Sequence, residues 1–104
     1  MVSVKRNILG ETAGDTITIV FDVSKNGTFF PVTSTWMFTM KKDSFEYSVA
    51  GTAVNDAGST TVTITVPSSK TSQVGQYNYA LTETNVGGSL STVVRGILTI
   101  ETKV

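Results

Sequence analysis

The chain has 104 residues and no net charge, with 8 Lys and Arg against 8 Asp and Glu. It contains no His and no Cys, which excludes Ser-His-Asp and Cys-His catalysis, the common zinc ligand sets, haem ligation and disulfides. The neutral balance also argues against nucleic-acid binding, because phosphate contacts need clustered positive charge. We therefore expect a single domain over residues 1–104 that is not an enzyme and holds no cofactor or metal.

The side-chain composition indicates an all-β fold. Thr, Val and Ile supply 38 of the 104 residues, whereas Ala and Leu supply only 9. β-Branched side chains have restricted χ1 rotamers, which favour pleated strands over helices. Ser and Thr together supply 29 residues, so we expect a surface whose polarity comes mainly from hydroxyl groups.

Two strands are expected in the first half of the chain, at residues 16–23 and 34–42, because apolar and polar residues alternate there. The apolar face of the first comprises Ile17, Ile19, Phe21 and Val23. The apolar face of the second comprises Trp36, Phe38 and Met40. Asn26-Gly27 lies between the two strands and predicts a two-residue turn, since both residues tolerate positive φ.

The middle of the chain predicts an edge strand and a hairpin. Residues 45–53 alternate weakly and are interpreted as one edge strand. The segment 55–58, Asn-Asp-Ala-Gly, predicts a turn into residues 61–66, where the alternation is most regular. Pro67 ends that strand, and residues 68–74 are expected to make one helical turn.

The remaining segments bring the expected total to about seven strands, the number typical of a β-sandwich. Residues 76–81 form a strand after Gly75. Its inward face comprises Tyr77, Tyr79 and Leu81. A turn at residues 85–88 leads into the last strand, residues 92–101, and residues 3–8 supply a further strand. The inward face of the last strand comprises Val94, Gly96, Leu98 and Ile100.

No targeting or membrane segment is recognisable. The N-terminus has no apolar run of signal-peptide length, and no stretch approaches the roughly 18 apolar residues of a transmembrane helix. If the sequence is the whole natural product, we expect it to remain in the cytoplasm in which it is made and not to bind a membrane.

Two features resemble the immunoglobulin-type (Ig-like) sandwich. The segment 75–79 resembles the tyrosine corner, in which a Tyr opens a strand two residues before the second disulfide Cys. By this resemblance Tyr79 stands at the Cys position, Phe21 replaces its partner, and Trp36 takes the place of the buried Trp. The fold class expected is therefore an Ig-like antiparallel β-sandwich without a disulfide, which suits a reducing compartment. The alternative is that any β-sandwich needs a few buried aromatic residues.

A longer resemblance runs from residue 14 to residue 100 and consists of short motifs. In chain order these are Gly14-Asp15-Thr16, Lys25-Asn26-Gly27, Pro31-Val32-Thr33, Lys41-Lys42, Pro67, Gly75-x-Tyr77-x-Tyr79-x-Leu81 and Arg95-Gly96-Ile97-Leu98-Thr99-Ile100. On these motifs the chain is similar to the small Ig-like domains of tailed-bacteriophage virions, such as the N-terminal domain of the upper baseplate protein.

This resemblance implies a structural virion component, either a head decoration or a tail or baseplate protein. Such a protein is made in the host cytoplasm, is located in the virion and acts by repeated protein–protein contacts. The implied partners are other virion proteins, such as the major capsid protein or a tail or baseplate protein, and further copies of the chain. Family members tend to continue into another domain, whereas this sequence stops, which favours a small head or tail component.

Carboxylate groups offer little for catalysis or metal binding. Asp43 and Glu46 lie three residues apart, and Asp56 lies in a predicted hairpin turn. A calcium loop needs several oxygen ligands at fixed spacing, and a glycoside hydrolase needs two facing carboxylates in a cleft. We therefore interpret the segment around Asp56 as a structural turn.

The last strand offers one candidate interface. If Val94 and Gly96 face the core, then Val93, Arg95 and Ile97 face outward. Apolar residues beside an Arg are enriched at protein interfaces. An ordinary strand on the covered side of a sheet remains the alternative.

Aromatic residues offer a second candidate interface. Phe29 and Phe30 are adjacent, so both cannot point into the core from one strand. Phe45 and Tyr47 share one face of the expected edge strand, whose unpaired backbone could accept another chain. We expect one of the two adjacent Phe residues, together with Phe45 and Tyr47, to contribute to a subunit or virion contact.

Two further functions stay open. A carbohydrate- or host-surface-binding module would use exposed aromatic residues, for which Phe29, Phe30 and Tyr47 are candidates while Trp36 is expected in the core. An Ig-like repeat excised from a bacterial surface protein would be distinguished by a larger parent chain.

Overall fold

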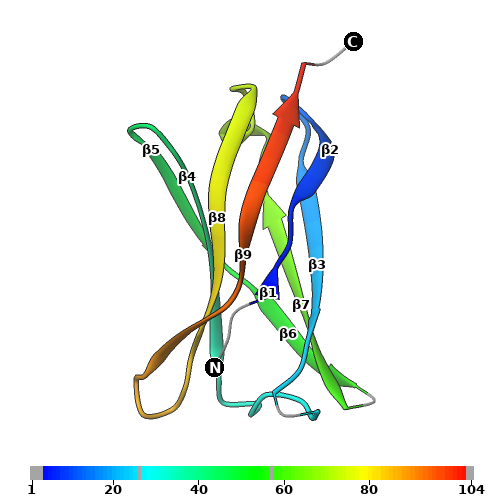
Figure 1. Cartoon of the computed structure of the whole chain (residues 1–104), viewed down its shortest axis with the longest axis vertical. Helices are drawn as coiled ribbons and strands as arrows, with labels where there is room; N and C mark the ends of the chain where they lie inside the picture. The colour runs from blue at the N-terminus through cyan, green and yellow to red at the C-terminus, as the bar shows by residue number, and fades with distance from the viewer. Residues whose placement is uncertain (1–3, 26, 57, 103–104) are drawn as a thin grey trace.

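The computed structural model describes residues 4–25, 27–56 and 58–102, and these segments form two packed β-sheets (Figure 1). The strands are β1 (Val4–Lys5), β2 (Ile8–Thr12), β3 (Ile17–Val23), β4 (Thr35–Lys42), β5 (Phe45–Ala50), β6 (Thr52–Asp56), β7 (Ser59–Val66), β8 (Gly75–Thr84) and β9 (Leu90–Glu101). A 3-10 turn, η1 (Ser68–Lys70), connects β7 to β8.

The strand order is that of an Ig-like sandwich. One sheet has six strands in the order β1-β9-β8-β4-β5, with β2 also pairing with β9, and the other has three in the order β3-β7-β6. All pairs are antiparallel except β1 and β2, which run parallel to β9. Because β3 and β4 follow one another in sequence but belong to different sheets, the chain crosses the sandwich between them (Figure 1). The expected all-β sandwich is confirmed.

The core consists of the inward faces predicted from the alternation. Strand β3 is buried at every second residue, as are the first six residues of β4. The buried apolar side chains are Ile17, Ile19, Phe21, Val23, Phe30, Trp36, Phe38, Met40, Val62, Ile64, Val66, Tyr77, Tyr79, Leu81, Val93, Val94, Leu98 and Ile100. Both sheets contribute to this single cluster, which lets the domain fold without a disulfide.

The aromatic residues at the centre match the expected Ig-like arrangement in part. The Tyr77 hydroxyl donates to the Gln73 carbonyl over 2.7 Å, as in a tyrosine corner. Phe21 and Tyr79 contact each other across the sandwich with ring centroids 5.9 Å apart. Phe38 stacks on Tyr79 at 5.4 Å, which places Phe38 where the Trp of an antibody domain would pack.

Trp36 is buried as predicted and packs near one end of the core. It is 4% exposed, and the Phe30 ring lies edge-on to it with the centroids 4.9 Å apart. T-shaped aromatic pairs of this kind are favourable beyond the area they bury. The indole therefore connects β4 to the loop that precedes it.

The single edge strand expected at residues 45–53 is wrong, because the chain changes sheets within it. Strand β5 belongs to the six-stranded sheet, and β6 belongs to the three-stranded sheet. Gly51 lies between them, and a Cβ there would come within 2.8 Å of the side chains of Val62 and Ile64. The absence of a side chain at this position lets the backbone pass close to the core.

The predicted turns agree with the structure where it describes them. Lys25 and Thr28 exchange two backbone hydrogen bonds, of 2.7 and 3.1 Å, around the expected two-residue turn. Gly27 and Gly58 both have positive φ. Asn26 and Ala57, which the turn predictions also included, lie outside the described residues, as do residues 1–3 of the expected first strand.

Candidate interaction surfaces

The seven residues predicted to form an interface lie in three separate places. They are Phe29 and Phe30 in the β3–β4 loop, Phe45 and Tyr47 on β5, and Val93, Arg95 and Ile97 on β9. The exposed Arg95 and the half-buried Ile97 share the outer face of the six-stranded sheet, whereas the other five lie elsewhere or face inward.

Within the β3–β4 loop, Phe29 and Phe30 point in opposite directions. Phe29 is 47% exposed, whereas Phe30 is fully buried, so Phe30 as a surface residue is wrong. The Phe30 N–H donates to the Thr60 hydroxyl over 2.8 Å, and the Asn55 side-chain amide donates to the Phe30 carbonyl over 3.0 Å. These bonds join the loop to the β6–β7 hairpin and hold Phe29 toward solvent.

The expectation that Val93 faces outward is wrong. The register of the β8–β9 pair shifts between Leu81 and Thr82, so that both Val93 and Val94 are buried. A bulge inserts one extra residue into one strand, which reverses the side-chain alternation beyond it. Arg95 follows the bulge and is exposed, as predicted.

Strand β5 is an edge strand, as predicted, and its aromatic residues are half-buried. Phe45 lies edge-on to Tyr77 at 5.7 Å, and the Lys70 ammonium lies 5.6 Å from the centre of the Tyr47 ring. Both side chains point toward the three-stranded sheet but are incompletely covered by it. They therefore form the rim of the core and not an open aromatic platform.

The outer face of the six-stranded sheet is broad and carries few charges. Cross-strand register places Thr39 beside Ala80 and Ala80 beside Arg95. Other outward residues of β4, β5, β8 and β9 include Thr35, Met37, Lys41, Glu46, Ser48, Ala50, Gln76, Asn78, Thr82, Thr84, Ile97 and Thr99. Most of these side chains end in a hydroxyl, an amide or a methyl group, as the composition predicted.

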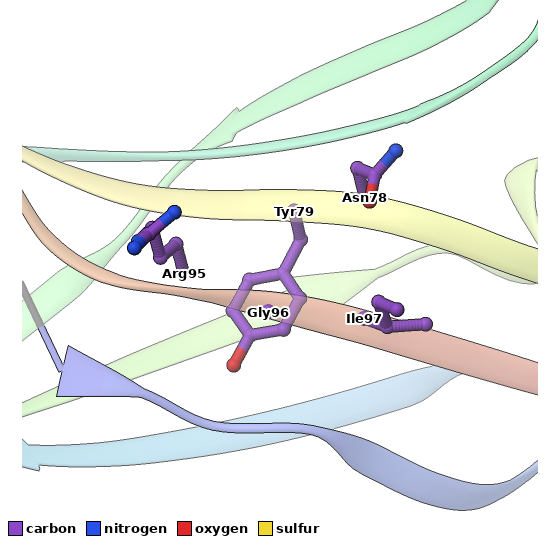
Figure 2. Close-up of a pocket in the computed structure, with 5 residues that line it drawn as sticks. All are labelled: Asn78, Tyr79, Arg95, Gly96 and Ile97. Atoms are coloured by element: carbon purple, nitrogen blue, oxygen red, sulfur yellow. The ribbon is translucent and has the colours of Figure 1, made fainter.

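A shallow hollow of about 370 Å³ lies on this face beside Arg95 (Figure 2). It is lined by Asn78, Tyr79, Arg95, Gly96 and Ile97. The salt bridges in the described part of the chain join Lys41 to Glu46 at 3.8 Å and Lys42 to Asp43 at 3.5 Å. Neither involves Arg95, so its guanidinium has no carboxylate partner among the described residues. The hollow thus combines an unpaired cation, an amide and an apolar side chain.

Behind this hollow, the N-terminal segment packs against β9 at Gly96. A Cβ on Gly96 would lie 1.8 Å from the Arg6 carbonyl oxygen, so only glycine allows this close approach. The Tyr79 ring lies across β9 at Gly96 and directs its hydroxyl toward the N-terminal strand (Figure 2), where the hydroxyl donates to the same Arg6 carbonyl. Burial raises the pKa of Tyr79 to about 12, and the nearby Arg6 guanidinium opposes that rise.

Arg6 ties the same segment to the other sheet. Its guanidinium donates to the Val20 carbonyl over 2.9 Å and lies 5.2 Å from the centre of the Phe21 ring. No local pattern predicts this cluster of Arg6, Tyr79 and Gly96, because Arg6 lies 73 positions before Tyr79 and farther still before Gly96. The one available signal was a glycine within an otherwise apolar strand, which often marks close backbone approach.

The carboxylates singled out from the sequence, where the structure describes their side chains, lie on the surface and not in a cleft. Asp43 and Glu46 are partnered by lysines on the surface. Glu83, which sequence reasoning missed, is 2% exposed and accepts a hydrogen bond of 2.5 Å from the Ser34 hydroxyl. Its position continues the inward alternation of Tyr77, Tyr79 and Leu81, so the pattern contained the signal. Among the described residues no group of three or more His, Cys, Asp or Glu could hold a metal ion.

In the described part of the chain, no helix is long and apolar enough to cross a membrane.

The fold has a counterpart among solved structures. No protein-family model and no curated protein matches the sequence. The chain is similar to the crystal structure of a candidate glycoside hydrolase from Bacteroides vulgatus ATCC 8482, with a TM-score of 0.52 and 13% sequence identity. The match covers 98% of this chain and 17% of that protein, so the chain spans about a sixth of its neighbour's length. At this identity the likeness concerns the fold.

Proposed function

We propose that the chain is a structural component of a tailed-bacteriophage virion, either a head decoration or a tail or baseplate protein. The observation that carries the proposal is the outer face of the six-stranded sheet, where Arg95, which has no salt bridge to a described residue, lies beside Ile97 on a broad, weakly charged surface. The motifs shared with Ig-like virion domains support the class of partner, which is another virion protein. The mode of action is binding without catalysis.

The chemistry of this face suits a permanent protein contact. Hydroxyl and amide groups cost less to remove from water than charges, and each can be paired across an interface. Arg and Met are enriched at interfaces, and Arg95 and the 43%-exposed Met37 lie on this face. A contact of modest strength becomes stable when it is repeated around a symmetric particle, because neighbouring attachments raise the effective concentration.

The experiment is to purify particles from cells that carry the gene and to look for the protein in them. Mass spectrometry of gradient-purified particles detects it, and immunogold electron microscopy distinguishes the head from the tail. We expect the wild-type chain to be present in the particles and an Arg95→Glu variant to be lost from them. Thr18→Glu on the exposed face of the other sheet is the matched control and should be retained.

The outcomes separate the proposal from its alternative. Particles that lack the wild-type protein would contradict a virion role. Specific binding in a glycan array, with no protein in particles, would instead favour the carbohydrate- or host-surface-binding module. Equal retention of the Arg95→Glu and Thr18→Glu variants would keep the virion role but remove the outer face as its contact.

A further inference from the structure

The free edge of β5 is built to pair with another strand. Gly51 donates to the Trp36 carbonyl over 2.9 Å, which sets the hydrogen-bonded pairs between β4 and β5 at alternate residues. By this alternation Phe45, Tyr47 and Val49 direct their backbone groups toward β4. The N–H and C=O groups of Glu46, Ser48 and Ala50 therefore point away from the sheet, on the side where β5 has no neighbouring strand within residues 4–25, 27–56 and 58–102.

Apart from the exposed Glu46, this edge carries none of the residues or irregularities that usually prevent strand addition. Protected edges carry Pro, Lys or a bulge, or are covered by other chain segments. The sequence of β5 is FEYSVA, and its register with β4 is uninterrupted. Two other edge strands are protected. On β3 the Arg6 guanidinium donates to the Val20 carbonyl, and the register of β2 against β9 is irregular between Ile8 and Glu11.

The inner face of β5 adds an apolar reason for association. The three-stranded sheet is narrower than the sheet it faces, so Phe45, Tyr47 and Val49 are only half-buried. The tip of the β4–β5 hairpin stands apart from the neighbouring strands in Figure 1. A hollow of about 660 Å³, lined in part by Phe45 and Val74, lies next to it. Pairing along β5 would extend this row of apolar side chains into a second molecule.

We propose that two copies of the chain pair antiparallel through β5, with the two-fold axis at Ser48. This register places Ser48 opposite Ser48 and Glu46 opposite Ala50, so that all the outward backbone groups of these three residues find partners. On the inner face it places Tyr47 opposite Val49 of the other copy, an aromatic–β-branched pair of a favourable kind. The product is one continuous sheet made of two six-stranded sheets.

Charge disfavours the neighbouring register closer to the hairpin tip. A shift of two residues in each strand toward the hairpin tip would place Glu46 opposite Glu46, and like charges directly opposite are destabilising. With the axis at Ser48, each Glu46 faces an uncharged Ala50 and keeps its own Lys41 at 3.8 Å. The occupant of the edge is therefore a second copy of this chain, because the strand is complementary to itself. The inference deepens the proposed assembly function and rests on it.

The test is sedimentation velocity of the wild-type protein and three variants over a concentration series up to about 1 mM. We expect a monomer–dimer equilibrium for the wild type. Ala50→Glu places one carboxylate opposite Glu46 at each of the two symmetric positions and should raise the dimer Kd roughly tenfold. Ala50→Lys instead places an ammonium group opposite Glu46 at both positions, leaves Lys41 with its partner, and should lower the Kd. Ala53→Glu, the same substitution on the edge strand β6, should leave the Kd unchanged.

Amide hydrogen exchange provides a second measurement that does not depend on a variant. In the dimer the Ser48 and Ala50 amides become hydrogen-bonded, so their exchange should slow as the protein concentration rises. A wild-type monomer at every concentration would overturn the proposal, as would a dimer that Ala50→Glu does not weaken. Particles that contain the protein although it stays monomeric in solution would contradict β5 pairing alone and leave the virion role standing.

Discussion

The two edges of the six-stranded sheet differ in how the chain treats their unpaired backbone. At the N-terminal edge, β1 and β2 pair in parallel with β9, Arg6 donates its N–H to the Arg95 carbonyl over 2.8 Å, and its side chain reaches the other sheet. At the opposite edge, β5 ends the sheet, and none of the strands that the structure describes pairs with its free side. We call these the closed edge and the open edge.

This contrast indicates which edge serves folding and which is available for association. The closed edge depends on contacts between residues far apart in sequence, such as the Asn7 side chain and the Ile97 N–H at 3.2 Å. The open edge is a local hairpin on β4, whose strands are joined by Asp43 and Ser44. Substitutions at the closed edge should therefore change stability, whereas substitutions at the open edge should change association.

The largest effect is expected from the core on which both edges depend. Replacing Trp36 by Ala removes the ring that packs against Phe30 and leaves a cavity beside the β3–β4 loop. We expect a loss of about 3–5 kcal/mol in the free energy of unfolding, measured with urea. A loss below about 1 kcal/mol would mean that Trp36 does not contribute to the core as its burial indicates.

A smaller but still large effect is expected at the closed edge. Gly96→Val would force its side chain into the Arg6 backbone, which cannot move without breaking the parallel pairing with β9. We expect a loss of about 2–3 kcal/mol. Gly87→Ala is the matched control, since its Cβ would meet only the Asn85 side-chain oxygen at 3.4 Å. Equal stability of the two variants would show that the close approach at Gly96 is not needed.

The Tyr79 hydroxyl should contribute less than the glycine that it faces. Tyr79→Phe removes the donor to the Arg6 carbonyl, and we expect a loss of about 1 kcal/mol in the free energy of unfolding. Tyr77→Phe removes the tyrosine-corner bond to Gln73 and offers a comparison of similar size. Stability unchanged in Tyr79→Phe would argue that water replaces the hydroxyl at the closed edge.

Alkaline pH should weaken the closed edge. Burial raises the pKa of Tyr79 to about 12 in the folded chain, and burial also raises the pKa of Tyr77. Above about pH 10 the unfolded chain loses tyrosine protons that the folded chain retains, so stability is complete below pH 10 and falls as the pH rises toward 12. Urea midpoints measured from about pH 8 to 11 should decrease, and Tyr79→Phe should reduce the decrease. A flat profile would contradict the burial of these hydroxyls.

The smallest effect on stability is expected at the open edge. Glu46→Ala removes a surface ion pair with Lys41 whose side chains are 57% and 62% exposed. Such pairs contribute little, so the free energy of unfolding should change by less than about 0.5 kcal/mol when measured on dilute monomer. A loss as large as that of Gly96→Val would mean that the two edges do not differ in the way proposed.

Much of the fold could be predicted because apolar and polar side chains alternate regularly along the central strands. Residues 17–23 and 35–42 alternate as expected, and the inward side chains of both segments are buried. The tyrosine corner was also recognisable, since Tyr77 and Gln73 are only four residues apart. These are local patterns, and local patterns are visible in a sequence.

The errors occurred where a tertiary contact overrides the local pattern. The bulge at Val93 reverses the alternation of inward and outward side chains in β9, and no residue type in the sequence indicates it. At Gly51 the chain passes from one sheet to the other within a segment that looks like one strand in the sequence. The core leaves no space for a side chain at this position. Phe30 turns inward because Asn55 and Thr60 satisfy its backbone. For the candidate interface, sequence reasoning identified Arg95 and Ile97 but missed the cluster that lies behind them.

The all-β class, the inward faces of the central strands and the low charge of the surface can be inferred from the residues alone. These properties follow from residue type and from a repeat of two, which need no information about distant parts of the chain. Which edge of the six-stranded sheet is closed and which is open depends instead on long-range contacts. The closed edge depends on the hydrogen bonds from Arg6 to β9 and to the Val20 carbonyl. Contacts between residues so far apart in the chain produce no periodic pattern in the sequence.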